Sequence, residues 1–273
     1  MRGNAQGLRR RHFKYRRSNE LVLFSWSHTE IPSIMLKANR KIIVGFILLT
    51  GFLAGVVVAD ASNDLQKGLH AYQQRDYATA LAYLRPLAEQ GVVEAQRKLA
   101  VMYRHGLGVN KDDAVAISWY RKAAEQGHVR AQNSLGVMYR FGLGVSKDSK
   151  EAVKWLTAAA EQDDAKGQEN IAMMYLDGDG VAQSDQQAVY WLTKAARQGQ
   201  MKSQLTLGVM TLAGRGVKKD DQQGMHWIMQ SANQGYPQAA EALAKAYADG
   251  LYGLEQDLQQ ARHWYQRAGK KFQ

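Results

Sequence analysis

The sequence predicts an all-α fold in which pairs of antiparallel helices stack into a solenoid. The first observation is a period of 36 residues, which relates the stretch 131–166 to 95–130, 167–202 and 203–238. The second is that glycine and tryptophan return with that period, at Gly106, Gly142, Gly178, Gly214 and Gly250 and at Trp119, Trp155, Trp191, Trp227 and, one residue later, Trp264. A period of about 20–50 residues indicates a repeat protein whose units bury their apolar faces against their neighbours.

The basic charge of the chain lies mostly before the repeats. The chain has 273 residues and a formal net charge of +11. Residues 1–41 carry ten basic and two acidic residues, whereas residues 60–273 carry 26 basic and 23 acidic ones. The repeats are therefore nearly neutral, so nucleic-acid binding is not predicted. The chain has no cysteine, which excludes disulfides, thiolate metal sites and a lipoprotein anchor.

An apolar run precedes the repeats. Residues 42–59 (IIVGFILLTGFLAGVVVA) carry no charge and follow three basic residues. A basic flank, an apolar run and small residues on both sides of Asp60 are typical of a secretory signal that is cleaved after Ala61. The run is also close to the ~20 residues that span a bilayer, so a retained membrane anchor is the alternative. Both interpretations predict repeats outside the cytoplasm, with membrane contact only through residues 42–59.

Met35 lies a few residues before this apolar run, where a signal peptide usually starts. We therefore expect translation to begin at Met35 rather than Met1, with residues 1–34 as a basic extension from an over-extended gene start. The predicted organisation is this extension, a signal peptide or anchor at 35–61, and repeats at 62–273.

Each unit is expected to form two antiparallel helices joined by a glycine loop. In the second unit, the first helix is predicted over residues 95–104 and ends before Gly106 and Gly108, because glycine after a helix readily adopts the left-handed conformation. Asp112 is predicted to begin the second helix by accepting hydrogen bonds from free backbone amides. Its counterparts are Asp148, Ser184, Asp220 and Asp257. Trp119 and small residues at helical spacing face one side of this second helix.

Six units follow one another without a linker. They are residues 62–94, 95–130, 131–166, 167–202, 203–238 and 239–273. The first unit lacks five residues of the glycine loop between Tyr72 and Asp76, which makes it similar to the 34-residue tetratricopeptide repeat. The last unit carries one extra residue near Tyr252.

The pattern within a unit resembles the Sel-one-like repeat family, which is related to tetratricopeptide repeats. In the third unit the matching residues are Ala131, Leu135, Gly136, Tyr139, Gly142, Gly144, Val145, Asp148, Ala152, Trp155 and Ala159. The resemblance covers residues 62–273 and implies a right-handed α-α superhelix of about six repeats that serves as a scaffold or adaptor for other proteins. Bacterial members of the family are often exported, and some act in envelope regulation or neutralise toxic effectors.

Three residues depart from the pattern. Asp163 replaces the turn glycine, Thr211 the tyrosine and Gly224 the alanine of the second helix. Local looseness is expected at the third turn and in the fifth unit.

No catalytic residue, cofactor or metal site is predicted. The glycine pairs follow no strand and lack the lysine of a phosphate-binding loop. Asp177 and Asp179 resemble the start of a calcium loop, but Val181 and Ala182 stand where an oxygen ligand and a glycine are needed. No two histidines in the repeats lie four residues apart on a helix, as a zinc site there would require.

A partner-binding surface is predicted on the first helices. If Ala131 and Leu135 face inward, helical spacing turns residues 133, 134, 137, 140 and 141 outward, onto the concave face. The predicted partner-binding residues are Arg97, Lys98, Arg104, Val137, Arg140, Phe141, Met173, Leu176, Leu205, Val209 and Leu212. In the alternative interpretation, Val101, Val137, Met173 and Val209 pack between adjacent first helices.

The sequence thus predicts a non-enzymatic scaffold, exported to the bacterial envelope, that binds a protein or peptide through the concave face. The alternatives are a membrane-anchored envelope regulator, an immunity-type binder of a toxic effector, and, last, a cell-wall-acting enzyme or ligand receptor. For an enzyme, Asp177 is the only obvious acid at a central position.

Overall fold

The computed structural model describes residues 12–17, 20–25 and 61–271. Contacts within the chain divide it into two units, Met1–Ser62 and Asn63–Gln273. The predicted start at Met35 and the apolar run 42–59 lie outside the described residues. Among the residues that are described, no helix is both long and apolar enough to cross a membrane.

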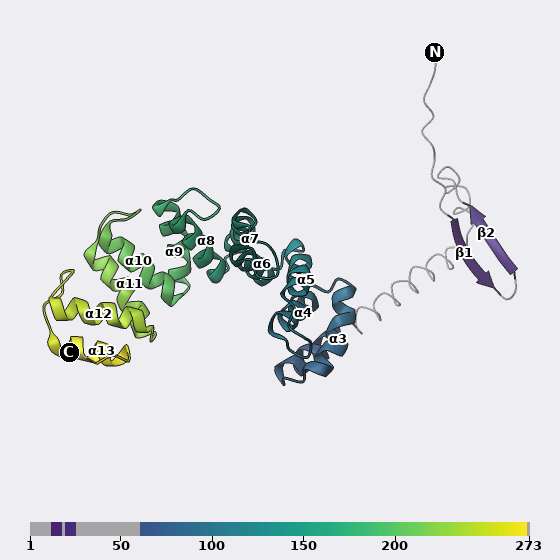
Figure 1. Cartoon of the computed structure of the whole chain (residues 1–273), viewed down its shortest axis with the longest axis horizontal. Coiled ribbons are helices and arrows are strands. Elements are labelled where there is room, and N and C mark those ends of the chain that lie inside the picture. The colour runs from purple at the N-terminus through teal and green to yellow at the C-terminus, as the bar shows by residue number, and fades with distance from the viewer. Residues whose placement is uncertain (1–11, 18–19, 26–60, 272–273) are drawn as a thin grey trace, which may run out of the picture. The chain divides into compact units, whose positions relative to one another are not determined.

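The described part of the first unit is a β-hairpin. Strand β1 (His12–Arg17) pairs antiparallel with β2 (Glu20–Ser25) in a register that places His12 opposite Ser25 (Figure 1). Sequence analysis predicted no element here.

The repeats form six pairs of helices, as predicted. The pairs are residues 61–73 with α3 (Tyr77–Glu89), α4 (Val93–His105) with α5 (Asp113–Glu125), α6 (Val129–Phe141) with α7 (Ser149–Glu161), α8 (Ala165–Asp177) with α9 (Asp185–Arg197), α10 (Met201–Ala213) with α11 (Asp221–Asn233), and α12 (Pro237–Asp249) with α13 (Leu258–Arg267). From α3 onward, each helix packs on the next one along the chain, and Figure 1 shows the pairs following one another along a curved row. This neighbour-to-neighbour packing defines a solenoid.

The predicted caps start the second helices. The side chain of Asp112 accepts a hydrogen bond from the amide of Val115 at 2.9 Å, and Asp148 accepts two from the first turn of α7. Because the first backbone amides of a helix have no partner within it, these carboxylates satisfy groups that would otherwise be exposed.

The glycine loops attach each unit to the one before it. Gly142 ends α6 in the left-handed conformation, with φ of 67°. Gly144, two residues on, lies against the backbone at the start of α5, where an added Cβ atom would stand 2.3 Å from the carbonyl of Asp113. Gly180 and Gly216 make equally close approaches to Ser149 and Asp185. The second glycine of these loops therefore forms the contact between units, and a side chain there would push them apart.

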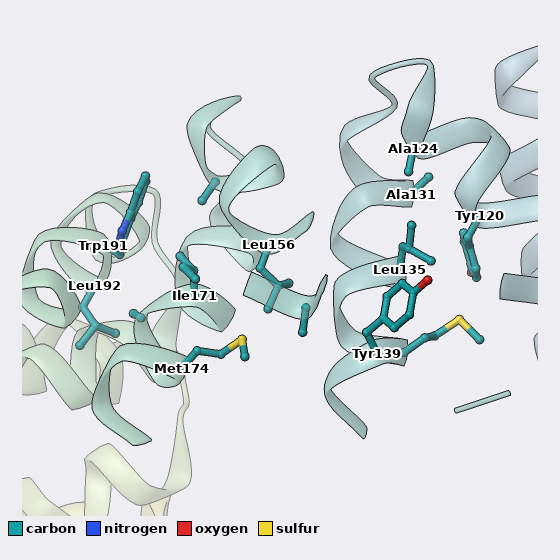
Figure 2. Packing of buried hydrophobic residues seen from close by; sticks show 14 of the residues in the cluster. Tyr120, Ala124, Ala131, Leu135, Tyr139, Leu156, Ile171, Met174, Trp191 and Leu192 are labelled. Atoms are coloured by element: carbon teal, nitrogen blue, oxygen red, sulfur yellow. The ribbon is translucent and has the colours of Figure 1, made fainter. Parts of the chain in front are cut away.

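Apolar side chains from successive helices fill the space between the layers. Leu135, Leu156, Ile171 and Leu192 are fully buried and follow one another through α6–α9 (Figure 2). The repeated tryptophans are buried or half-buried against this core, which confirms the structural role predicted for them. A second apolar cluster begins in the fifth pair with Leu212 and continues to the C-terminal helices.

A row of buried glutamines joins the units and was not predicted from the sequence. Gln132 of α6 donates from Nε2 to the carbonyl oxygen of Ala124 in α5 (3.2 Å) and accepts at Oε1 from Nε2 of Gln162 after α7 (2.7 Å). One side chain thus connects three consecutive helices. The same bonds recur at Gln96 with Gln126, Gln168 with Gln198 and Gln204 with Gln234.

Candidate functional site

The first helices of adjacent pairs contact one another directly. Helix α6 packs on α8 as well as on its neighbours along the chain. Asn170 donates to Asn133 across this contact at 2.8 Å, and Arg140 pairs with Asp177 at 2.7 Å. In a curved double row, the layer whose members approach most closely lies on the inside. We therefore call the exposed and half-buried surface of α4, α6, α8, α10 and α12 the inner face.

At α4, the basic residues predicted to bind a partner are engaged within the protein. Arg97 donates two hydrogen bonds to Glu94, at 2.6 and 2.9 Å, and Glu94 also contacts the ring of His128 at 3.0 Å. Burial would raise the pKa of Glu94, but hydrogen bonds and positive charge from Arg97 and His128 outweigh burial and hold that pKa well below its usual range. Lys98 lies 4.3 Å from the ring of Tyr72, and burial, together with the charge of Arg97, lowers the pKa of this lysine.

A polar hollow of about 480 Å³ lies beside this cluster. It is lined by Arg97, Arg130, Asn133, Ser134, Asp164, Ala165, Lys166 and Gln200. Arg130 and Lys166 are exposed, stand at matching positions one unit apart, and form no ion pair with the described residues. They carry the uncompensated positive charge of the inner face here, which sequence analysis placed instead on Arg97, Lys98 and Arg104.

In the middle of the inner face, some side chains pack against the core and others are exposed to solvent. Val101 and Val137 are half-buried against the core. Phe141, in contrast, is 63% exposed at the end of α6, and the guanidinium of Arg140 lies 5.4 Å from the centre of its ring. Of the central residues predicted to bind a partner, Phe141 is thus the most accessible.

Leu212 does not belong to the exposed surface that was predicted from the sequence. Helical spacing predicted an exposed position for this residue on α10, but only 8% of it is exposed. A Cβ atom built on Gly224 in α11 would lie 2.6 Å from Cδ2 of Leu212, so the leucine occupies the space that the alanine of other units fills. Leu176 and Leu205 are half-buried against the core, whereas Val209 is 50% exposed.

An apolar pocket of about 320 Å³ opens between α10 and α12. Its lining is Val209, Leu212, Ala213, Met225, Ile228, Ala242, Lys245, Ala246, Leu251 and Tyr252. Leu212, Met225 and Ile228 are buried and form the floor. Val209, Leu251 and Tyr252 are exposed and border the opening. We call this site the C-terminal pocket.

The structure brings only two of the predicted partner-binding residues, Val209 and Leu212, together in this pocket. Leu251 and Tyr252 were missed because they lie in the loop after α12 and not on a first helix. The signal that could have found them is the extra residue of the last unit, which interrupts the 36-residue period at that loop.

No group of three or more His, Asp or Glu side chains gathers in a metal-binding arrangement within the described ranges. Asp179, part of the calcium-like sequence, instead accepts a hydrogen bond from Ser149 at 2.5 Å and lies 3.4 Å from Lys147. The hydrogen bond from Ser149 and the charges of Lys147 and Arg140 lower the pKa of Asp179. Its carboxylate therefore links the fourth unit to the third.

Comparison with known proteins identifies a repeat family. The family model described as Sel1 repeat matches six consecutive segments, residues 65–92, 93–128, 129–164, 165–200, 202–236 and 237–271. No curated protein matches the chain.

Solved structures of repeat proteins resemble the chain closely. A protective antigen of uropathogenic Escherichia coli with an SLR fold is 36% identical over 81% of this chain, with a TM-score of 0.74, and the match spans 48% of that protein. A Sel1 repeat protein from Oxalobacter formigenes is 33% identical over 76% of this chain and 82% of its own, with a TM-score of 0.72. The chain thus spans about half the length of the Escherichia coli protein.

Proposed function

The chain belongs to the Sel1 repeat family, and on that basis we propose that it is a scaffold that binds a segment of a partner protein along the concave inner face. Stacked helix pairs offer a continuous surface rather than a single enclosed site, which suits an extended protein segment.

Exposed apolar side chains on the inner face carry this proposal. Among the described residues, seven large apolar side chains are exposed, and three of them border the C-terminal pocket. Phe141 is a fourth exposed apolar side chain, at the end of the first helix α6. Apolar groups clustered around a pocket mark an interaction site, whereas apolar residues scattered singly over a surface do not.

The titratable groups of the inner face are better suited to binding than to catalysis. Glu94 has a strongly lowered pKa, but Arg97 and His128 occupy its carboxylate. A carboxylate held ionised by two partners is poorly placed to exchange a proton with a substrate. We therefore assign it to the connection between the second and third helix pairs and propose no reaction.

We also propose that the scaffold acts in the bacterial envelope. The support is the apolar run at 42–59 behind basic residues, which is the pattern of an export signal. The related Escherichia coli protein is described as a protective antigen, which fits a protein that leaves the cytoplasm. If the signal is cleaved as expected, N-terminal sequencing of protein from a periplasmic extract will begin at Ser62. Intact protein in the membrane fraction would favour the anchor, and protein confined to the cytoplasm would refute export.

The scaffold function is tested by affinity capture from an envelope extract. We compare the natural chain with a double variant, Phe141→Glu and Val209→Glu, which places charge on two exposed positions of the inner face. The expected result is that mass spectrometry finds partners enriched on the natural chain and lost on the variant. Leu212 is left unchanged because replacing a buried leucine would disturb the core.

A matched control uses exposed apolar residues away from the inner face. Tyr190 and Leu258 lie on the second helices α9 and α13 and are 51% and 52% exposed. Their replacement by Glu should leave capture unchanged, and circular dichroism should show equal helix content in all proteins. Equal capture by the inner-face variant would refute the proposal.

A further inference from the structure

Resting on the proposed function, we infer what the C-terminal pocket binds: a large apolar side chain of the partner segment, next to an aspartate or glutamate that pairs with Lys245. The reasons are the departures from the repeat at the pocket, the loop that borders it, and the unpaired charge at its wall.

The pocket lies in the unit that carries smaller residues than other units at three places. Thr211 stands where Tyr139 stands in the third unit, and Ala213 stands where Phe141 stands. Gly224 replaces an alanine, and Leu212 turns inward to cover it. The third and fourth units carry none of these three replacements.

The loop of the last unit is built differently from the other glycine loops. In earlier units, the second glycine lies against the preceding unit, as at Gly144, where an added Cβ atom would stand 2.3 Å from the carbonyl of Asp113. At Gly253, the second glycine of the last loop, an added Cβ atom would have no described residue within 4 Å apart from its neighbours in the chain. The extra residue, with Tyr252 at a φ of 57°, carries this loop away from such a contact. Leu251 and Tyr252 border the C-terminal pocket instead.

Lys245 gives the pocket an unpaired positive charge. It occupies the helix position that holds Val101, Val137, Met173 and Val209 in the four preceding units, so it ends an aliphatic row. It is exposed, lines the pocket, and forms no ion pair with the described residues. Glu241, one turn earlier in α12, is already paired with Lys270 at 2.5 Å.

These features select the chemistry of the occupant. A volume of about 320 Å³ with a buried floor of Leu212, Met225 and Ile228 accepts one large aliphatic or aromatic side chain. An ammonium group at the wall adds binding energy and specificity when a carboxylate approaches it. The expected motif is therefore Leu, Met, Phe or Trp with an acidic residue one or two positions away in an extended segment.

A random peptide display library selected on immobilised full-length protein tests the inference. The natural chain should enrich peptides that combine a large apolar residue with a nearby Asp or Glu. Ala213→Trp places an indole at the pocket mouth, at an exposed residue that ends α10, and should abolish binding of those peptides. His105→Trp, at the same repeat position in α4, is the control and should bind them normally.

Lys245→Glu tests the charge. It should weaken binding of the acidic peptides by about tenfold or more and enrich peptides with Lys or Arg beside the apolar residue instead. Enriched peptides that lack an acidic residue, or that bind Lys245→Glu equally well, would overturn the inference. Peptides that bind Ala213→Trp normally but do not bind Phe141→Glu would also overturn the inference, while still supporting the proposed function of the inner face. If no peptides are enriched, the result counts against both the inference and the proposed function.

Discussion

Buried polar side chains set the strength of the contacts between units at the scale of single residues. Gln132 is buried, and both ends of its amide are used: the nitrogen binds a carbonyl of the preceding unit, and the oxygen accepts from Gln162. A buried amide is stable only when its hydrogen-bonding groups are satisfied. The row of glutamines therefore demands one relative placement of three helices, which apolar packing alone specifies less tightly.

Replacing Gln132 by Leu should destabilise the protein by about 1 kcal/mol, because the buried side chain loses its hydrogen bonds to the carbonyl of Ala124 and from the amide of Gln162. Chemical unfolding followed by circular dichroism measures the change. Gln186→Leu is the control, since Gln186 is exposed on α9 and should alter stability by less than about 0.5 kcal/mol. Equal stability of the two variants would show that the row of buried glutamines does not stabilise the protein.

Glu94 makes the stability of the protein depend on acid pH. Its pKa is lowered on folding, so its contribution is complete above the unfolded value of 4.5 and is lost as pH falls further toward the folded value. Glu94→Gln should therefore be less stable than the natural chain at pH 7, and the difference should shrink on acidification. Unfolding midpoints measured at several pH values test this.

The control for that series is Glu161→Gln. Glu161 is exposed at the end of α7 and forms no ion pair with the described residues. Its variant should follow the natural chain at every pH. A difference for Glu94→Gln that stays constant from pH 7 to strong acid would contradict the assignment of the acid sensitivity to this carboxylate.

At the scale of an element, the glycine loop combines two separate demands on its second glycine. Gly144 has a φ of 71°, which costs other residues free energy, and it also touches the backbone of α5. Gly253 has a φ of 77° without any such contact. The two loops therefore separate the cost of conformation from the cost of contact within one protein.

Gly253→Ala should destabilise the protein by about 1 kcal/mol, the cost of the left-handed conformation alone. Gly144→Ala should lower the free energy of unfolding by about 2–5 kcal/mol. Its Cβ atom would stand 2.3 Å from the carbonyl of Asp113, so the backbone of the loop or of α5 would have to move. Thermal unfolding of the two variants is the measurement. Similar losses would mean that the loop does not hold the units together.

The loops and caps could be predicted from the sequence, whereas the pocket could not. Gly142 and Asp148 meet local requirements of the backbone: a left-handed residue ends α6, and a side-chain acceptor starts α7. Because both residue types recur with the period, the sequence alone predicts these roles. The exposure of Leu212 depends instead on what faces it from α11. Helical spacing predicts which way a residue points but not whether the facing helix leaves room for its side chain. Because Gly224 has no side chain, Leu212 lies in the core and not on the predicted surface.

On the scale of the whole repeat region, the ties between units weaken toward the C-terminus. The glutamine row ends at Gln204, because Ala240 stands at the next position. The last loop does not lie against the preceding unit at Gly253. Two connections that recur along the earlier units are thus missing between the fifth and the sixth.

In a chain of units that touch only their neighbours, the unit with the weakest interface opens first. We therefore expect amide hydrogen exchange, followed by mass spectrometry, to show α12 and α13 exchanging faster than α6–α9, which the glutamine row and the docked loops hold on both sides. A peptide that fills the C-terminal pocket contacts α10, α12 and the last loop together, so it should slow exchange in α12 and α13 selectively. Exchange at one common rate across all six pairs would show a single cooperative unit and would contradict the weakening at the fifth pair.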